Sequence, residues 1–523
     1  MRNSFTQNLT WFWQNAERIL IVIFLATFTF NIRKVFLTPY SYLNGEFNEY
    51  LTLSFSWADL LMLAVILIYT TKLLYSQLKG REAKGLTPHN NNIEKSSNTG
   101  LLRSLHNVSR LPRNTIGYLC QLLKGAFSSL IVVWGETFWL ALFLAWTFLS
   151  IFWSTYKPIA FYKIAGLFLV VIFALILIAK LKEKKWLKMA VFALILNGVF
   201  QSTLGITQFI NNGSVGLRLI GESIVSQNLP GVAKIILAGG KHIRAYGTLP
   251  HPNILAGFLI LPTFLIVSEL VQRTALRTGG GKDVARETIL EGAPTGFLLA
   301  ALCFIAAGFV LALSRSAFLG LGIGFLLLFG LNFNLLGRTL RFSHLKERLL
   351  LLLVMLVMIS FLVAFFLPAG KILFSSKSLS ERNLYLDVSR EIISEHPISG
   401  VGIGQFILSE YKNYSNLEGW HYQPVHNVYL LITSELGTVG LILLLLFILT
   451  ILHNCCINTK RKNRNTGLLR MTDNLFCVII LAFIVISLFD HYFWDIKTGM
   501  IIFALAVIFS KIMGGIEKPN SAG

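Results

Sequence analysis

The chain contains repeated apolar runs, each close to the length of one membrane crossing, separated by polar connections. A helix needs about 20 apolar residues to cross the roughly 30 Å hydrocarbon layer of a bilayer. Only 14% of the 523 residues are charged and 54% are hydrophobic, whereas a soluble protein carries about a quarter charged residues. We therefore expect an all-α polytopic membrane protein.

About twelve membrane-spanning helices are expected from these runs. Their approximate ranges are 18–36, 54–76, 134–154, 159–181, 187–209, 252–271, 295–313, 316–334, 349–367, 427–451, 474–490 and 498–514. The apolar stretch around the third span is too long for one simple crossing, so its first part fits an interfacial or tilted helix. The first run lacks a small-residue cleavage site, which indicates a retained membrane helix rather than a removed signal peptide.

The distribution of charge indicates the orientation of these spans. The net charge of +21 comes mainly from Lys and Arg in five connections, at 72–127, 180–188, 272–286, 337–348 and 458–470. Cytoplasmic loops carry an excess of Lys and Arg. With both termini in the cytoplasm, all five connections fall on the cytoplasmic side. The charge therefore fits orientation and contact with membrane lipids, and nucleic acid is not an expected partner.

This topology divides the chain into four parts. They are an N-terminal hairpin with a basic cytoplasmic loop (1–133), a transmembrane core with an outer loop at 210–251 (134–367), a large extracytoplasmic loop carrying short helices (368–426) and the C-terminal transmembrane helices (427–523). No cysteine lies in an outer loop, so no extracytoplasmic disulfide framework is expected. The outer loops face a compartment without ATP or nucleotide sugars, so any group transfer there needs an energy-rich donor.

Two polar clusters adjoin the first outer loop and the core. Arg244, His251 and Asn253 lie in "RAYGTLPHPN", before the sixth span, where Pro252 suits the first turn of a helix. Arg315 occupies the short outer turn between the seventh and eighth spans. An arginine inside an apolar stretch is costly unless it is paired or reaches water, which makes it a candidate functional residue. Snorkelling of either arginine to the interface is the structural alternative.

A third cluster lies in the large outer loop. Ser380 is expected to cap a helix that starts at Glu381 and ends before His396-Pro397. Its apolar stripe is expected to face the membrane, and Arg382 and Arg390 project elsewhere; the stripe is Leu384, Val388 and Ile392. The glycine string "GVGIG" that follows lacks the preceding strand of a dinucleotide site. We interpret it as a tight return toward the membrane.

The fourth cluster is "HNVYLLITSELGTVG", which opens the tenth span with His426 and Asn427. The small residues Gly437 and Gly440 permit close helix packing. A lone interfacial histidine is more often structural. Combined with three arginines on the same side of the membrane, however, it indicates a site for a multiply charged anion, and phosphate suits bidentate arginine best.

A lipid-linked diphosphate would place its charge at this depth. Neutral His426 could remove a proton from an acceptor hydroxyl while arginine stabilises the departing diphosphate. We therefore take His426, Arg315 and Arg382 as candidate catalytic residues. Candidate substrate-binding residues are Arg244, His251, Asn253, Arg390 and Asn427. The chain has no Asp-x-Asp signature and no His/Cys/Asp cluster with metal spacing, so neither a metal nor another cofactor is expected.

Together the four clusters resemble the O-antigen ligase and polymerase family of bacterial membrane glycosyltransferases, over about residues 140 to 500. The most specific feature is His-Asn, nine residues, Gly, two residues, Gly, from His426 onward. The resemblance implies a metal-independent enzyme of the bacterial inner membrane. It would transfer a glycan from undecaprenyl diphosphate to a hydroxyl of lipid A core, a related glycolipid or a polysaccharide, at the periplasmic face. It also implies that His426 is the essential histidine, that Arg315 and Arg382 hold the donor diphosphate, and that Arg244 is a further motif arginine.

Alternatives remain open at this point. The same superfamily contains chain polymerases and protein O-glycosyltransferases, and no motif maps onto the 77–127 loop. An anion transporter is compatible with twelve spans and buried arginines. However, transporter sites usually lie near the middle of the bilayer, whereas these clusters lie at its outer surface.

Overall fold

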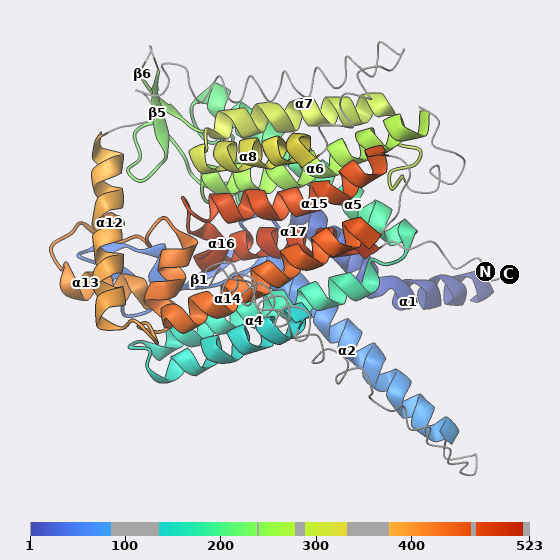
Figure 1. Ribbon diagram of the computed structural model, residues 1–523, viewed down its shortest axis with the longest axis horizontal. Helices are drawn as coiled ribbons and strands as arrows, with labels where there is room; N and C mark the ends of the chain where they lie inside the picture. Colours follow the sequence, from blue (N-terminus) through green and yellow to red (C-terminus); the bar gives the residue numbers. More distant parts are fainter. Residues whose placement is uncertain are drawn as a thin grey trace, which may run out of the picture.

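The structure is a computed structural model that describes residues 2–84, 135–237, 240–277, 288–331, 376–461 and 467–515. It is mostly helical, and the long helices run side by side in one bundle (Figure 1). The bundle helices are α1 (Arg2–Thr27), α2 (Trp57–Lys84), the apolar helix Gly135–Phe152, α4 (Lys157–Lys180), α5 (Lys184–Asn211), α6 (Pro252–Arg277), α7 (Thr295–Ala312), α8 (Arg315–Leu331), α14 (Val428–Arg461), α15 (Gly467–Ile486) and α17 (Lys497–Gly515).

The prediction of a polytopic helical membrane protein is confirmed. Within the described residues, seven helices are long and apolar enough to cross a membrane, and α8 and α15 contain shorter apolar segments. The expected ninth span, 349–367, and most of the 77–127 loop lie outside the described residues. The count of about twelve spans therefore stays a prediction.

The expected first span, 18–36, is wrong at its C-terminal end. Helix α1 ends at Thr27, and β1 (Arg33–Phe36) pairs antiparallel with β4 (Leu53–Ser56). The charged residues Arg33 and Lys34 are exposed in this strand, and the sheet satisfies backbone groups that a helix end would leave open. A second small hairpin joins β2 (Tyr42–Leu43) to β3 (Glu46–Phe47) through a tight turn.

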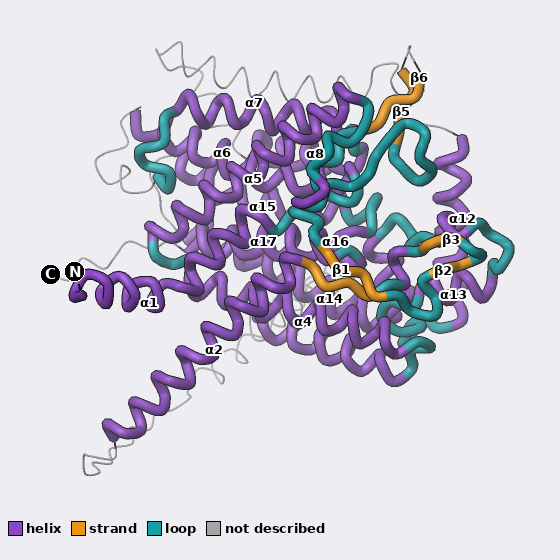
Figure 2. The backbone as a smooth tube through the Cα atoms, turned by 180° about the vertical axis from the view of Figure 1, so that it is seen from behind, coloured by secondary structure: helices purple, strands orange, loops and turns teal. Residues whose placement is uncertain are grey.

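The two outer loops gather at one end of the bundle. Helix α12 (Ser376–Glu395) runs across this end, beside α13 (Phe406–Asn413) (Figure 1). The hairpin of β5 (Lys234–Leu237) and β6 (Gly240–Ile243), from the first outer loop, lies at the same end, as do the other strands (Figure 2). Helix α1 begins and α17 ends at the opposite end. The arrangement thus groups the segments expected to be extracytoplasmic.

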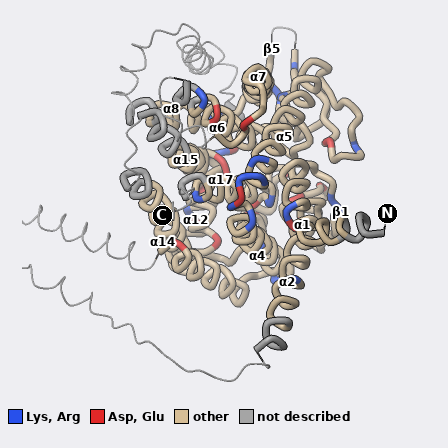
Figure 3. The backbone as a smooth tube through the Cα atoms, turned by 90° about the vertical axis from the view of Figure 1, so that its right-hand side faces the viewer, with Lys and Arg blue, Asp and Glu red and all other residues tan. Residues whose placement is uncertain are grey.

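Charged residues tie the helices together at the opposite end. Glu17 of α1 is buried and forms ion pairs with Lys72 of α2 and Lys180 of α4. Seen from this end, Lys, Arg, Asp and Glu gather among the helices, whereas the peripheral helix α7 carries no charged residue (Figure 3). Ion pairs therefore hold the helices together at the end that is expected to face the cytoplasm.

Helix α12 differs from its prediction in two ways. It begins at Ser376, one turn before the expected Glu381, so Ser380 lies inside the helix and is not its N-cap. It does end at Glu395, directly before His396. The expected stripe packs on protein, because Val388 and Ile392 are buried and Ser389 hydrogen-bonds Ser434 of α14 at 3.0 Å. The apolar face of α12 therefore covers the outer end of the bundle rather than the membrane.

The glycine string after α12 forms the predicted tight return. Gly400, Gly402 and Gly404 all have positive φ, at 64°, 99° and 71°. The returning backbone packs against α14, where Gly437 (φ 70°) interrupts the helix and a Cβ would overlap the carbonyl of Ile398. Gly437 therefore permits close approach of a loop, not of a helix as the spacing had suggested.

Helix α6 lies at the centre of the bundle. In its apolar segment Pro252–Leu270, 89% of the residues are buried, a larger share than in the other spanning candidates of the described chain. The segment that precedes α6 carries Arg244, His251 and Asn253. The outer end of the central helix is therefore the place where these polar side chains meet residues of other helices.

Candidate active site

A hydrogen-bonded network links Arg244 to the end of the bundle. Its Nε donates to the carbonyl of Ala312 at 2.8 Å, and its Nη2 donates to Oδ1 of Asn253 at 2.6 Å. Asn253 in turn donates from Nδ2 to Asp490 at 2.9 Å, and Ser316 donates to the same carboxylate oxygen at 2.7 Å. The network connects the first outer loop with α6, α8 and the segment between α15 and α17.

Local sequence places each member of this network. Arg244 directly follows β6, and its backbone N–H donates to Ala233 at 3.2 Å. Pro252 begins α6, and the carbonyl of His251 accepts the first N–H bonds of the helix. Leu313, with φ 48°, forms the turn between α7 and α8, which puts Arg315 at the first position of α8. Short turns therefore fix all of these side chains at one level.

Burial lowers the pKa of Arg244 to about 10, and the positive charge of Arg315 adds to this effect, while Tyr246 and Asp490 oppose it. The guanidinium therefore stays charged at neutral pH. Arg315 also interacts electrostatically with Arg382 and Asp490. Three arginines thus contribute positive charge near the buried carboxylate of Asp490, which suits an anionic ligand.

His426 lies between two other rings. Its imidazole stacks on His491, with ring centroids 4.8 Å apart and an interplanar angle of 15°, and Tyr385 of α12 meets it edge-on at 5.8 Å. Its Nδ1 is buried and has no hydrogen-bond partner among the described residues. Burial lowers the pKa of His426 well below its ordinary value, and the positive charges of His491 and Arg382 lower it further. A neutral imidazole results.

His251 is a second neutral imidazole in the site. Its Nδ1 accepts a hydrogen bond from the backbone N–H of Asn253 at 3.1 Å. Burial lowers the pKa of His251 to about 3, and Arg244, His491 and Arg382 contribute in the same direction. Because Nδ1 accepts, the proton of the neutral ring is on Nε2. His251 can therefore donate a hydrogen bond from Nε2 to an oxygen of a ligand.

Arg382 reaches the site from α12. It is half-buried, and its charge acts on His251, His426 and Arg315. Within the described part of the chain it makes no hydrogen bond or ion pair of its own, so its donors are available to a ligand. Arg382 thus brings the large outer loop to the same place as α6, α8 and α14.

Two predicted residues have other surroundings. Arg390 is exposed and pairs with Asp387 at 2.8 Å, one turn away on α12. Asn427 caps α14, because its Oδ1 accepts the N–H groups of Tyr429 and Leu430 at 2.9 and 3.0 Å. The structure does not bring Arg390 to the site, and the side chain of Asn427 is engaged in holding the start of α14 beside His426.

The segment between α15 and α17 holds three residues that the sequence analysis did not single out. Asp490 anchors the arginine network, and His491 hydrogen-bonds Asp495 through Nδ1 at 2.9 Å. Burial by itself would lower the pKa of His491, but Asp495 and then Asp490 raise it above its ordinary value. The available signal was the string "DHYFWD", with His and Asp four residues apart at the outer end of a span.

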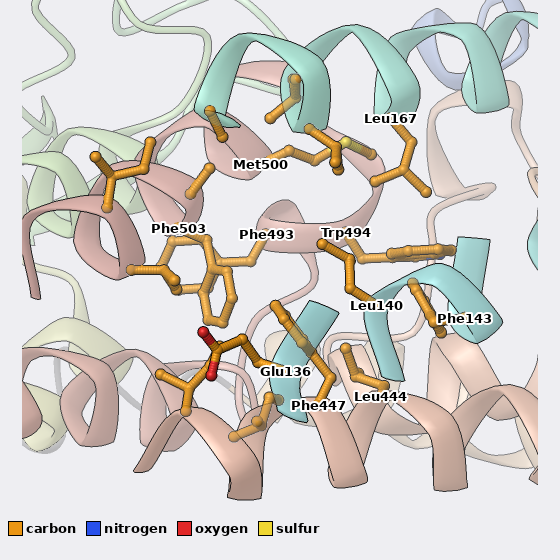
Figure 4. Close-up of a pocket in the computed structure, with 18 of the residues that line it drawn as sticks. Glu136, Leu140, Phe143, Leu167, Leu444, Phe447, Phe493, Trp494, Met500 and Phe503 are labelled. Atoms are coloured by element: carbon orange, nitrogen blue, oxygen red, sulfur yellow. The ribbon is translucent and has the colours of Figure 1, made fainter. Parts of the chain in front are cut away.

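An apolar cavity of about 170 Å³ opens next to these residues. The helix Gly135–Phe152, α4, α14 and α17 enclose it (Figure 4). Its outer end includes Val428 and Trp494, which lie two residues after His426 and three residues after His491. At its inner end Glu136 pairs with Lys511. The cavity thus runs along these apolar helices and ends at a charged pair.

Comparison with known proteins gives one family match. Residues 299–445 match the family model described as O-antigen ligase. The matched range contains Arg315, Arg382 and His426. The comparison with curated proteins gave no match. Residues 299–445 are therefore similar to the O-antigen ligase family.

Proposed function

We propose that the protein transfers a glycan from undecaprenyl diphosphate to a hydroxyl group of a glycolipid such as lipid A core, at the periplasmic face of the bacterial inner membrane. The single observation that carries this proposal is the convergence of neutral His426 with the charges of Arg244, Arg315 and Arg382. These groups come from four separate elements at the outer end of the bundle.

The proposed reaction assigns each group a step. Neutral His426 removes the proton of the acceptor hydroxyl, whose oxygen forms a bond to the anomeric carbon of the glycan. The bond between that carbon and the diphosphate oxygen breaks, and the electron pair leaves with the diphosphate. Arg382 and Arg315 stabilise the negative charge that develops on this leaving group. Arg244, held by Asn253, contributes a further positive charge.

The apolar cavity supports a polyprenyl carrier as the donor. Its outer end adjoins His426 and its walls are almost wholly hydrocarbon, as Leu167, Leu444 and Phe503 illustrate (Figure 4). A polyprenyl chain in this cavity would leave its diphosphate at the outer end, beside the arginines. We therefore propose that binding of the chain adds affinity while the head group is held for reaction.

The proposal is tested in the producing cell by His426→Ala. The variant should reach the membrane in normal amounts yet attach no glycan, while His396→Ala, which alters an exposed histidine, should act as the wild type. Accumulation of full-length lipid-linked chains in the His426 variant supports ligation. Loss of long chains, with single repeats still attached, would instead identify a polymerase. Unchanged surface glycan would exclude His426 as the base.

A further inference from the structure

His491 and Asp495 form a hydrogen-bonded pair next to His426, the proposed base. The reaction described above gives neither residue a role. The Nδ1 of His491 lies 2.9 and 3.0 Å from the two carboxylate oxygens of Asp495. Both side chains are only 7% exposed. The imidazole of His491 stacks on that of His426, whereas the Nδ1 of His426 has no partner among the described residues. One histidine thus has an orienting carboxylate, and the reacting one has an orienting ring.

The pairing decides which ring takes a proton first. Asp495 accepts from Nδ1 of His491, and a hydrogen-bonded carboxylate stabilises the imidazolium form. Two stacked rings whose centroids are 4.8 Å apart repel each other if both are charged, so they titrate as a coupled pair. The first proton therefore stays on His491, and His426 remains in the form that can accept one.

We propose that His491, held by Asp495, is the positioning residue of His426: its ring fixes the plane of the reacting imidazole, and its charge keeps that imidazole unprotonated until the acceptor hydroxyl delivers a proton. This role rests on the proposed function, because it gives His426 the part of the base. His491 itself does not exchange a proton with the substrate.

Other charged and titratable groups around the pair agree with this order. Around His491 lie Asp490 of the same segment, Lys163 of α4 and Tyr50 of the first outer connection. Around His426 lie Arg382 of α12, the edge of Tyr385, and His251 before α6. The carboxylates of Asp490 and Asp495 act on His491, whereas the charges that act on His426 are positive. This asymmetry raises the pKa of His491 and lowers that of His426.

The test is a titration of the histidine rings by nitrogen NMR, with the full-length protein in nanodiscs and isotope-labelled histidine. The signal of His426 is identified by its loss in His426→Ala. In the wild type we expect His426 to stay neutral from about pH 8 to about pH 5. His491→Phe keeps a ring but removes the charge, and in this variant the titration midpoint of His426 should rise by about one pH unit.

A second variant and a matched control complete the titration experiment. Asp495→Asn preserves shape and lowers the charge on His491, so it should shift the midpoint of His426 in the same direction as His491→Phe. His396→Phe makes the same exchange at an exposed histidine and should leave the midpoint unchanged. A midpoint that coincides with the wild type in both His491→Phe and Asp495→Asn overturns the proposal.

Glycan transfer in cells provides the second readout. If His491 acts through His426, His491→Phe should retain part of the transfer and lose more of it at acid pH than at neutral pH. Loss as complete as in His426→Ala at every pH would overturn the proposal, because His491 would then be the base. The NMR titration needs no substrate, so it decides the charge relation even if wild-type protein proves to transfer no glycan.

Discussion

At the scale of single residues, the site depends on which charges are compensated and which are left for a ligand. Asp490 compensates part of the charge of Arg244 and Arg315, and Asn253 and Ser316 donate hydrogen bonds to it. Arg382 has no partner of its own among the described residues, and Arg390, two turns further along α12, is paired and exposed. The two arginines of the same helix are therefore expected to differ in function.

Replacing Arg382 tests this difference. Arg382→Ala should lower the rate of glycan transfer by at least about 100-fold, because a charged donor to the leaving group is lost. The rate of Arg382→Lys should lie between the rates of the wild type and Arg382→Ala, since lysine keeps the charge without the bidentate geometry. The rate is measured as release of undecaprenyl diphosphate by purified protein. Arg218→Ala, at an exposed arginine of the first outer loop, is the control, and a rate for Arg382→Ala equal to it would contradict the assignment.

Most of the candidate site residues could be predicted from the sequence, because the residue types give their charges and the expected topology gives their side of the membrane. Arg244, Arg315 and His426 lie near the outer ends of expected spans, and Arg382 lies in the large outer loop. The hydrogen-bond and stacking partners of these side chains could not be predicted in this way. The bond between Asn253 and Asp490 joins residues far apart in the sequence, and nothing in the local pattern around Asp490 indicates its partner. The same holds for the stacking of His491 on His426.

At the scale of elements, the structure differs from expectation where tertiary contacts outweigh local pattern. The apolar stripe of α12 gives the correct buried face, since Val388 and Ile392 are buried. Periodicity cannot distinguish a face that packs on lipid from one that packs on protein. The prediction that the stripe faces the membrane was therefore wrong. The first span was extended too far because β-branched and apolar residues near Arg33 suit a strand as well as a helix.

The kink in α14 can be tested by Gly437→Ala. The substitution places a Cβ at positive φ and against the carbonyl of Ile398. It should lower the stability of the protein by about 2–4 kcal/mol, from the strained conformation and the overlap together. The loss is measured as a lower melting temperature in detergent. Gly296→Ala, where a Cβ meets open space in α7, should not reduce the melting temperature, and equal effects of both variants would contradict the role of the kink.

The cavity between the helices can be tested by filling it. Ala504→Trp adds a large ring among its lining residues. It should raise the KM for the lipid-linked donor by about tenfold, since loss of about two methylene contacts costs that factor, with little change in kcat. Leu326→Trp, on the exposed side of α8, is the control. A donor KM that does not change in Ala504→Trp would place the polyprenyl chain elsewhere.

At the scale of the whole molecule, the proposed function requires that α12 and the bundle end beneath it face the periplasm. The distribution of Lys and Arg predicted this orientation before any contact was known, and the described loops do gather at one end (Figure 1). The direction of that end relative to the cell remains a prediction of the charge rule. The number of crossings depends in part on residues outside the described ranges.

Cysteine labelling measures the orientation directly. In a background without the native cysteines, Ser394→Cys on the exposed side of α12 should react with a membrane-impermeant maleimide in intact spheroplasts. Lys182→Cys, in the exposed turn between α4 and α5 at the other end, should react only after lysis. The opposite pattern would put the site in the cytoplasm and remove the need for a lipid-linked donor.

The central claim is tested most directly by reconstituting the reaction with purified components. Wild-type protein in nanodiscs is incubated with undecaprenyl-diphosphate-linked glycan and candidate glycolipid acceptors, and the released undecaprenyl diphosphate is quantified. We predict release that depends on the acceptor and is abolished in His426→Ala but not in Arg218→Ala. Equal release by wild type and His426→Ala would contradict the account, as would a wild-type protein that carries an anion into liposomes yet transfers no glycan.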